Sequence, residues 1–152
     1  MEAVRAWLLK ISSTDQLAIG EHELVEILAH PQTHHIPKTP AHCRQVIIWR
    51  GLFLPLLRPA LLTGRNDDTG EQPVFTAVIA FQENPDTPLK YGALTLAEVP
   101  VSIQVEPGPA IEPPALSNTI RNELPLSCFR YDGSAILVFD MKKLFNLPPI
   151  RL

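Results

Sequence analysis

The chain has 152 residues, of which 45% are hydrophobic and 19% are charged, and its formal net charge at pH 7 is -3. This length suffices for one domain with a hydrophobic core, or for two small lobes that share a core. The weakly negative charge excludes the basic field that proteins use to hold nucleic acids or anionic membranes, and no segment reaches the roughly 18 apolar residues that span a bilayer. We therefore expect a cytoplasmic protein without direct membrane insertion.

Two apolar segments near the N-terminus predict short strands. Residues 5–11 and 16–19 are rich in large aliphatic side chains, and a polar turn at 12–15 separates them. The next segment, 21–28, fits a helical face and a strand equally well, because it is too short for periodicity to decide. Sixteen prolines, about twice the usual share, favour short elements throughout the chain.

A segment rich in histidine and proline, residues 30–43, is expected to be irregular apart from a helical turn at 40–43. The side chains that raise the hypothesis of a zinc site here are His30, His34, His35, His42 and Cys43. Zinc requires ligands that converge on a tetrahedron, and no pair in this segment has the spacing of ligands on a rigid element. We therefore expect a surface loop, with neither a metal nor a cofactor bound.

Residues 46–57 are the most informative segment, because two runs of β-branched, aromatic and large aliphatic residues flank Arg50 and Gly51. This pattern predicts two buried strands joined by a tight turn. Arg50 is the exception in an apolar stretch, and a guanidinium is seldom buried without a partner. It therefore either reaches solvent or meets a carboxylate. Glu26 is one candidate, because in a strand it would face away from its two apolar neighbours.

The second half of the chain repeats the short-strand pattern. Strands are predicted at 74–81, 91–96, 99–105, 127–131 and 135–139. Pro100 places the third of these at a sheet edge or a bulge, and the Asp132-Gly133 turn joins the last two in a hairpin. Residues 141–147 predict a terminal helix with Asp140 as its N-cap.

Many short strands separated by frequent turns indicate an all-β fold of the barrel or sandwich type. The strands fall into two clusters on either side of the polar segment 65–72, which suggests two small barrels packed face to face.

No motif in the sequence predicts catalysis. The Gly133-Ser134 pair lacks the flanking glycines of a strained nucleophile turn, and a phosphate-binding glycine loop is absent. His42 adjoins Cys43 in sequence rather than facing it. We therefore expect no enzyme, and we expect Cys43 and Cys128 to be free thiols in a reducing compartment.

The order of these elements resembles that of the CheW-like domain, the adaptor of bacterial chemosensory arrays. The family has a Val-x-Glu-Ile segment after its second strand, and the chain has Leu24-Val25-Glu26-Ile27. The family's central motif, Gly-Val-x-Asn-Leu-Arg-Gly-x-x-x-Pro-x-x-Asp-Leu, corresponds to residues 45–59, where Arg50, Gly51 and Pro55 match it. The closing segment 137–145 resembles the family's last strand and helix.

Three departures from this motif change the chemical character of the side chain. Gln45, Ile48 and Arg58 replace the family's Gly, Asn and Asp. The resemblance implies a single CheW-like domain over 1–152, made of two five-stranded SH3-like barrels around a shared core with a short C-terminal helix. We expect lobe 1 at about 14–64 plus the C-terminal segment, and lobe 2 at about 74–138.

Family members bind the regulatory domain of the histidine kinase CheA and the hairpin tip of methyl-accepting chemoreceptors, and divergent members occur in systems that control type IV pili. The resemblance therefore implies a non-enzymatic adaptor without a cofactor, cytoplasmic and recruited to membrane-associated receptor arrays. It implies protein-binding roles for Glu26, Ile48, Arg50 and Arg58. One alternative is a modulator that occupies adaptor positions without coupling. Another is a ligand-binding or nucleic-acid-binding barrel, which would need a groove with exposed aromatic side chains.

Overall fold

The computed structural model describes residues 4–11, 16–37, 45–58, 75–105, 125–139 and 141–145. Within these ranges the chain forms β-strands and one short helix. The elements are β1 (Val4–Lys10), β2 (Gln16–Gly20), β3 (Leu24–Ala29), β4 (Thr33–His35), β5 (Gln45–Trp49), β6 (Leu52–Leu57), β7 (Phe75–Phe81), β8 (Lys90–Leu96), β9 (Val101–Val105), β10 (Pro125–Tyr131), β11 (Ser134–Phe139) and α1 (Met141–Phe145).

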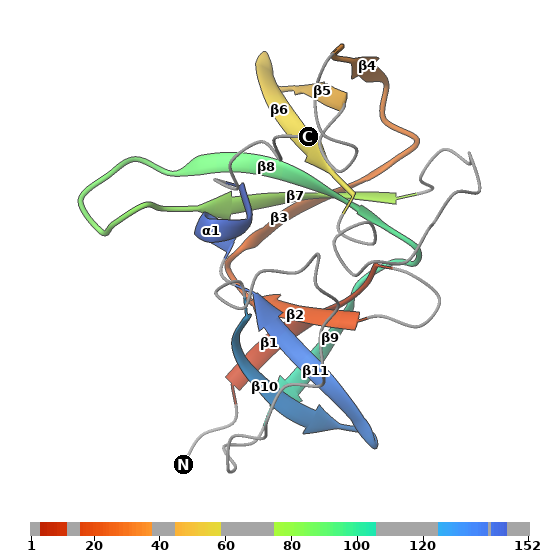
Figure 1. The fold of residues 1–152 in the computed structure, drawn as a ribbon, viewed down its shortest axis with the longest axis vertical. Coiled ribbons are helices and arrows are strands. Elements are labelled where there is room, and N and C mark those ends of the chain that lie inside the picture. Colours follow the sequence, from red (N-terminus) through yellow and green to blue (C-terminus); the bar gives the residue numbers. More distant parts are fainter. Residues whose placement is uncertain are drawn as a thin grey trace.

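The strands form two sheets, which Figure 1 shows one above the other with α1 near their junction. The terminal sheet has five strands in the order β10-β11-β2-β1-β9, and the central sheet has six in the order β3-β7-β8-β6-β5-β4. Only two neighbouring pairs in the described part of the chain are parallel, β11 with β2 and β6 with β8. The expected all-β fold of two lobes with a short C-terminal helix is confirmed, although one sheet has a sixth strand.

The sheets divide the chain differently from the expected lobe boundaries. The expected lobes are 14–64 plus the C-terminal segment and 74–138, whereas the sheets group β2 with β1, β9, β10 and β11. The terminal sheet also takes β9, β10 and β11 from the second half of the chain, so the polypeptide crosses between sheets after β2 and again after β8. Which strands share a sheet depends on their pairing in three dimensions. β6 and β7 lie on either side of the polar segment 65–72 in the sequence, and both belong to the central sheet.

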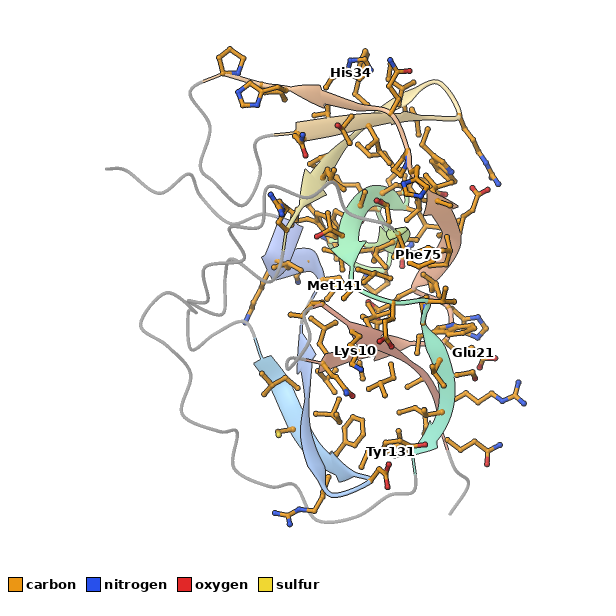
Figure 2. The ribbon with its side chains drawn as sticks, turned by 90° about the vertical axis from the view of Figure 1, so that its right-hand side faces the viewer. Lys10, Glu21, His34, Phe75, Tyr131 and Met141 are labelled. Carbon is orange, nitrogen blue, oxygen red and sulfur yellow. The ribbon has the colours of Figure 1, made fainter. Side chains whose placement is uncertain are left out.

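One hydrophobic core lies between the two sheets and α1, as expected for lobes that share a core. The terminal sheet and the residue after β1 contribute Leu9, Ile11, Leu17 and Ile19; the central sheet contributes Leu57, Ala77, Ile79, Leu94 and Leu96; the helix contributes Met141 and Leu144. Figure 2 shows Met141 at the waist of the molecule. Burying this many aliphatic groups stabilises the two lobes as one unit.

A second cluster fills the opposite face of the central sheet. Its buried members are Ile47, Trp49, Leu54, Leu56, Val78 and Ala93, with Leu28 and Tyr91 packed against them. The two clusters share β7 and β8 because successive side chains of a strand point to opposite faces. The face of the central sheet that points away from the shared core therefore has a small core of its own. Buried side chains of both β5 and β6 belong to this small core.

The ambiguous segment at 21–28 forms a turn followed by β3, which pairs antiparallel with β7. Pairing with β7 decides for the strand where periodicity could not. β4 was not expected, because its three residues lie in the histidine-rich segment, where only pairing with β5 reveals a strand. β9 follows Pro100 and lies at a sheet edge, as predicted. The expected helical turn at 40–43 and the cap Asp140 lie outside the described residues.

Cys128 is a free thiol in the interior, and burial raises its pKa above the ordinary value of 9.0. Cys43 lies outside the described residues. In the described part of the chain, no helix is long and apolar enough to span a bilayer.

Candidate interaction site at the β5–β6 hairpin

The tight corner predicted from the sequence is a two-residue hairpin turn. β5 and β6 pair antiparallel up to Trp49 opposite Leu52, and Arg50 and Gly51 between them have φ angles of 49° and 78°. Positive φ at both positions is typical of a type I′ turn, whose twist suits the flanking strands. Glycine adopts this conformation freely, whereas arginine is uncommon in it. The backbone thus holds an unfavourable residue type at the tip of the hairpin.

The two strands of the hairpin present one buried and one exposed face. Trp49 is 7% exposed and points into the small core of the central sheet. On the other face, Ile48 and Phe53 lie directly opposite each other and are 54% and 73% exposed. Val46 and Pro55 form the next pair on this side. We call these four residues, Val46, Ile48, Phe53 and Pro55, the hairpin face.

Glu26 of β3 lies across from the end of β5 and connects to it through Trp49. The indole Nε1–H of Trp49 donates a hydrogen bond of 2.6 Å to Glu26 Oε2. Arg50 Nη2 lies 3.7 Å from the same oxygen, and the Arg50 guanidinium carbon lies 4.5 Å from the centroid of the Trp49 ring. Trp49 also packs against Tyr91, with ring centroids 5.2 Å apart and planes tilted by 49°. We call Glu26, Trp49 and Arg50 the acid-indole-guanidinium cluster.

The contacts in this cluster differ in strength. The bond to the carboxylate is short and charge-assisted, so it fixes both side chains. The Arg50–Glu26 pair is longer than a hydrogen bond, and the two side chains are 68% and 40% exposed. Such a pair contributes about 0–1 kcal/mol, and an exposed cation over an aromatic ring about 0.5–1 kcal/mol. The Arg50 guanidinium is therefore held only weakly, over a Trp49 ring that packing keeps in place.

The structure brings together two of the four residues that the sequence singled out, and it places a third on the other face of the same hairpin. Glu26 and Arg50 form the expected acid–base pair, and Ile48 lies two residues from the turn on the exposed face. Arg58 follows the last residue of β6, at the opposite end of the strand from the turn. It therefore does not belong to the same cluster, and its position in the family motif was its only signal.

Two residues of the site were not predicted. The sequence predicts Trp49 only as a buried strand residue, and its bond to Glu26 depends on β3 and β5 closing toward each other, which no local pattern reveals. Phe53 was taken as part of a buried run, but the register with β5 puts it on the exposed face. Strict alternation from Trp49 through the two-residue turn would have placed Phe53 beside Ile48.

The histidines considered for zinc do not gather with other ligands where the structure describes them. His34 and His35 are neighbours on β4 and are exposed, and His30 precedes that strand with a φ angle of 51°. No group of three or more histidine, cysteine, aspartate or glutamate side chains among the described residues could hold a metal ion. His42 and Cys43 lie outside the described residues.

Comparison with known proteins identifies the fold and the family. The profile of the CheW-like domain matches residues 7–148. A search of curated proteins finds no match. Among solved structures, the scaffolding protein TtCheW from Thermoanaerobacter tengcongensis is similar, with a TM-score of 0.74 and 16% sequence identity over 96% of this chain and 94% of that chain. At this identity the likeness is one of fold, and it agrees with two SH3-like lobes. Because the profile covers nearly its whole length, the chain belongs to the CheW-like domain family, a family of scaffold proteins in chemosensory signalling.

Proposed function

We propose that this protein is a non-enzymatic adaptor that couples a chemoreceptor-type sensor to a CheA-type histidine kinase. Membership of the CheW-like family supports a scaffold role in chemosensory signalling. The hairpin carries the more specific part of the proposal. It combines an exposed cation in a strained backbone conformation with an exposed apolar pair, and strained residues that stability does not favour tend to occur at functional sites.

The hairpin has the composition of a protein-binding surface. Ile48 and Phe53 offer apolar area that a partner would remove from water, and Phe53 is the more exposed of the two. Arg50 adds a planar cation able to bind a carboxylate through two parallel hydrogen bonds. We assign direct binding to Ile48, Arg50 and Phe53, and to Glu26 a supporting role in the site through its contacts with Trp49 and Arg50. Arg58 remains a proposed contact of a second surface, at the other end of β6.

Calorimetric titration tests this proposal with two ligands, the regulatory domain of a CheA-type kinase and a receptor hairpin fragment. We expect at least one of them to bind, and Arg50→Ala to weaken that binding roughly tenfold. Arg5→Ala is the matched control, because Arg5 is also an exposed arginine beside a glutamate, 3.9 Å from Glu21. If neither ligand binds at tens of micromolar, the adaptor role does not apply to this protein.

A modulator that occupies adaptor positions without passing the signal is the second candidate. The replacement of the family's Asn and Asp by Ile48 and Arg58 favours it, because both changes alter the character of the side chain that a partner would meet. Kinase activity in a reconstituted receptor–kinase array separates the two functions. An adaptor raises the activity or its response to stimulus, whereas a modulator lowers both as it displaces a working adaptor. We infer that the protein works in the cytoplasm, recruited to receptor arrays at the membrane.

A further inference from the structure

The carboxylate of Glu26 is shared unequally between two donors. The Trp49 indole reaches Glu26 Oε2 at 2.6 Å, whereas Arg50 Nη2 stops 3.7 Å from it. Among the described residues, the guanidinium of Arg50 makes no hydrogen bond. An arginine next to a glutamate ordinarily gains most from a direct, bidentate contact. In this chain the neutral indole takes that place instead.

The indole is well placed to keep the carboxylate. Trp49 lies on β5, is 7% exposed, and packs against Tyr91 in the small core of the central sheet. Its Nε1–H therefore points in a direction fixed by packing. Arg50 is 68% exposed at the side chain and sits at a turn, so ordering it costs more conformational entropy than ordering Trp49. The buried Trp49 N–H therefore makes the hydrogen bond to the Glu26 carboxylate. The exposed Arg50 guanidinium keeps its own N–H donors for another acceptor.

We propose that Trp49 is the positioning residue of this site: it takes the short hydrogen bond to Glu26 Oε2 and leaves Arg50 with only the longer ion pair, so that the guanidinium remains available for a carboxylate on the partner's surface. The part of this inference that concerns the partner rests on the proposed function. The partner's contact surface then carries an aspartate or glutamate beside apolar side chains, which complements Arg50 at the turn and the exposed Ile48 and Phe53 on the two strands that the turn joins. Inside such an interface a guanidinium–carboxylate pair is worth more than it is in water.

The decisive variants are Trp49→Phe and the double variant Trp49→Phe with Glu26→Gln. Trp49→Phe keeps an aromatic ring beneath Arg50 but removes the N–H, so Glu26 is released to bind Arg50 directly. We expect the receptor hairpin fragment or the kinase domain, whichever binds the unaltered protein, to bind Trp49→Phe about tenfold more weakly. Adding Glu26→Gln removes the competing charge, and we expect it to restore most of the affinity. If Trp49 has only a structural role, adding Glu26→Gln will not restore the affinity. That result would overturn the inference.

A second measurement does not depend on any partner. Nuclear magnetic resonance of the arginine side chains reports whether the Arg50 guanidinium rotates freely or is held by a bidentate pair. We expect rapid rotation in the unaltered protein, slowed rotation in Trp49→Phe, and rapid rotation again in the double variant. Equal rotation in all three overturns the inference even if binding is seen. Failure of both ligands to bind, with the expected change in rotation, would instead reject only the proposed function.

Trp7→Phe is the matched control for the loss of an indole N–H. Trp7 Nε1–H donates to the backbone carbonyl oxygen of Glu21 at 3.2 Å, so its removal releases no carboxylate. We expect this variant to leave both the rotation of Arg50 and the affinity for the ligand unchanged. An equal loss of affinity in Trp7→Phe and Trp49→Phe would mean that general destabilisation explains the effect, and the inference would be wrong.

Discussion

Gly92 of β8 lies directly beneath the ring of Phe145, so closely that a β-carbon on Gly92 would overlap three atoms of that ring. The Phe145 ring is also stacked on Phe81, with centroids 5.1 Å apart and planes 7° from parallel. The helix that closes the chain thus rests on the central sheet at a point where only a hydrogen atom fits.

Gly92→Ala is therefore expected to move Phe145 off the sheet and to loosen α1. Overpacking of this kind costs about 1–3 kcal/mol, which urea unfolding would show as a lower free energy of unfolding. Combining Gly92→Ala with Phe145→Leu should recover part of the loss, because the smaller side chain leaves room for the methyl group. Equal stability of Gly92→Ala and the unaltered protein would show that the helix does not need this close contact.

The turn at Arg50 predicts that stability and binding can be separated. Asparagine tolerates the left-handed conformation better than alanine does, so Arg50→Asn should be about 1 kcal/mol more stable than Arg50→Ala. Both variants lack the guanidinium, and both should bind the partner equally weakly. Asp132→Asn is the control, because Asp132 occupies the same position of the other two-residue turn with φ of 50° and already is a favoured residue type. Thermal unfolding and titration of the four proteins would check this order.

The hairpin face predicts a binding loss without a stability loss. Phe53 is 73% exposed, so Phe53→Ser removes little buried area and should change the free energy of unfolding by less than about 0.5 kcal/mol. The same change should weaken partner binding by roughly tenfold if Phe53 is an interface anchor. Val4→Ser on the terminal sheet, where Val4 is 65% exposed, should alter neither quantity. Similar binding by both serine variants would exclude the hairpin face from the interface.

The buried thiol of Cys128 predicts low reactivity and a loss of stability in alkali. Since desolvation raises its pKa in the folded state, little thiolate forms near neutral pH, and a disulfide reagent should react at least about tenfold more slowly with the native than with the urea-unfolded chain. The measurement uses Cys43→Ser so that a single thiol reports.

The sign of the pH effect follows from linkage. The folded thiol keeps its proton to higher pH than the unfolded thiol, so its contribution to stability is complete below about pH 9.0 and is lost as the pH rises through the folded value. Cys128→Ala should flatten the stability curve in this range. A native thiol that reacts as fast as the unfolded one would contradict the burial of Cys128.

The sequence predicted what depends on local pattern, and it failed where partners are distant. The strands at residues 75–81 and 134–139 and both glycine turns are visible in apolar runs and turn residues. β3 could not be separated from a helix until β7 was known to lie beside it. The grouping of strands into sheets could not be predicted, because a parallel pair, Leu17 opposite Leu137, joins segments that are far apart in the sequence, and no composition change records that pairing.

The candidate site was predicted in part for the same reason. Gly51 between two apolar runs marks the turn, and both strand alternation and the family motif pointed to Glu26. The contact that organises them, from Trp49 to Glu26, depends on β3 closing toward the end of β5 in three dimensions. For Arg58 the family motif was misleading about position. The motif suggested a place in the site, but Arg58 lies at the end of β6 away from the turn.

On the ribosome, β2 is made long before β11, and this side of β2 stays unpaired until Leu137 and Val138 are synthesised and align with Leu17 and Ala18. Among the described strands, β3 to β8 follow one another in the chain and pair with one another, so that sheet can assemble earlier. Exposed strand edges invite aggregation. A nascent chain that stops before β11 therefore carries an open edge on β2, and correct biosynthesis of this protein depends on the synthesis of β11.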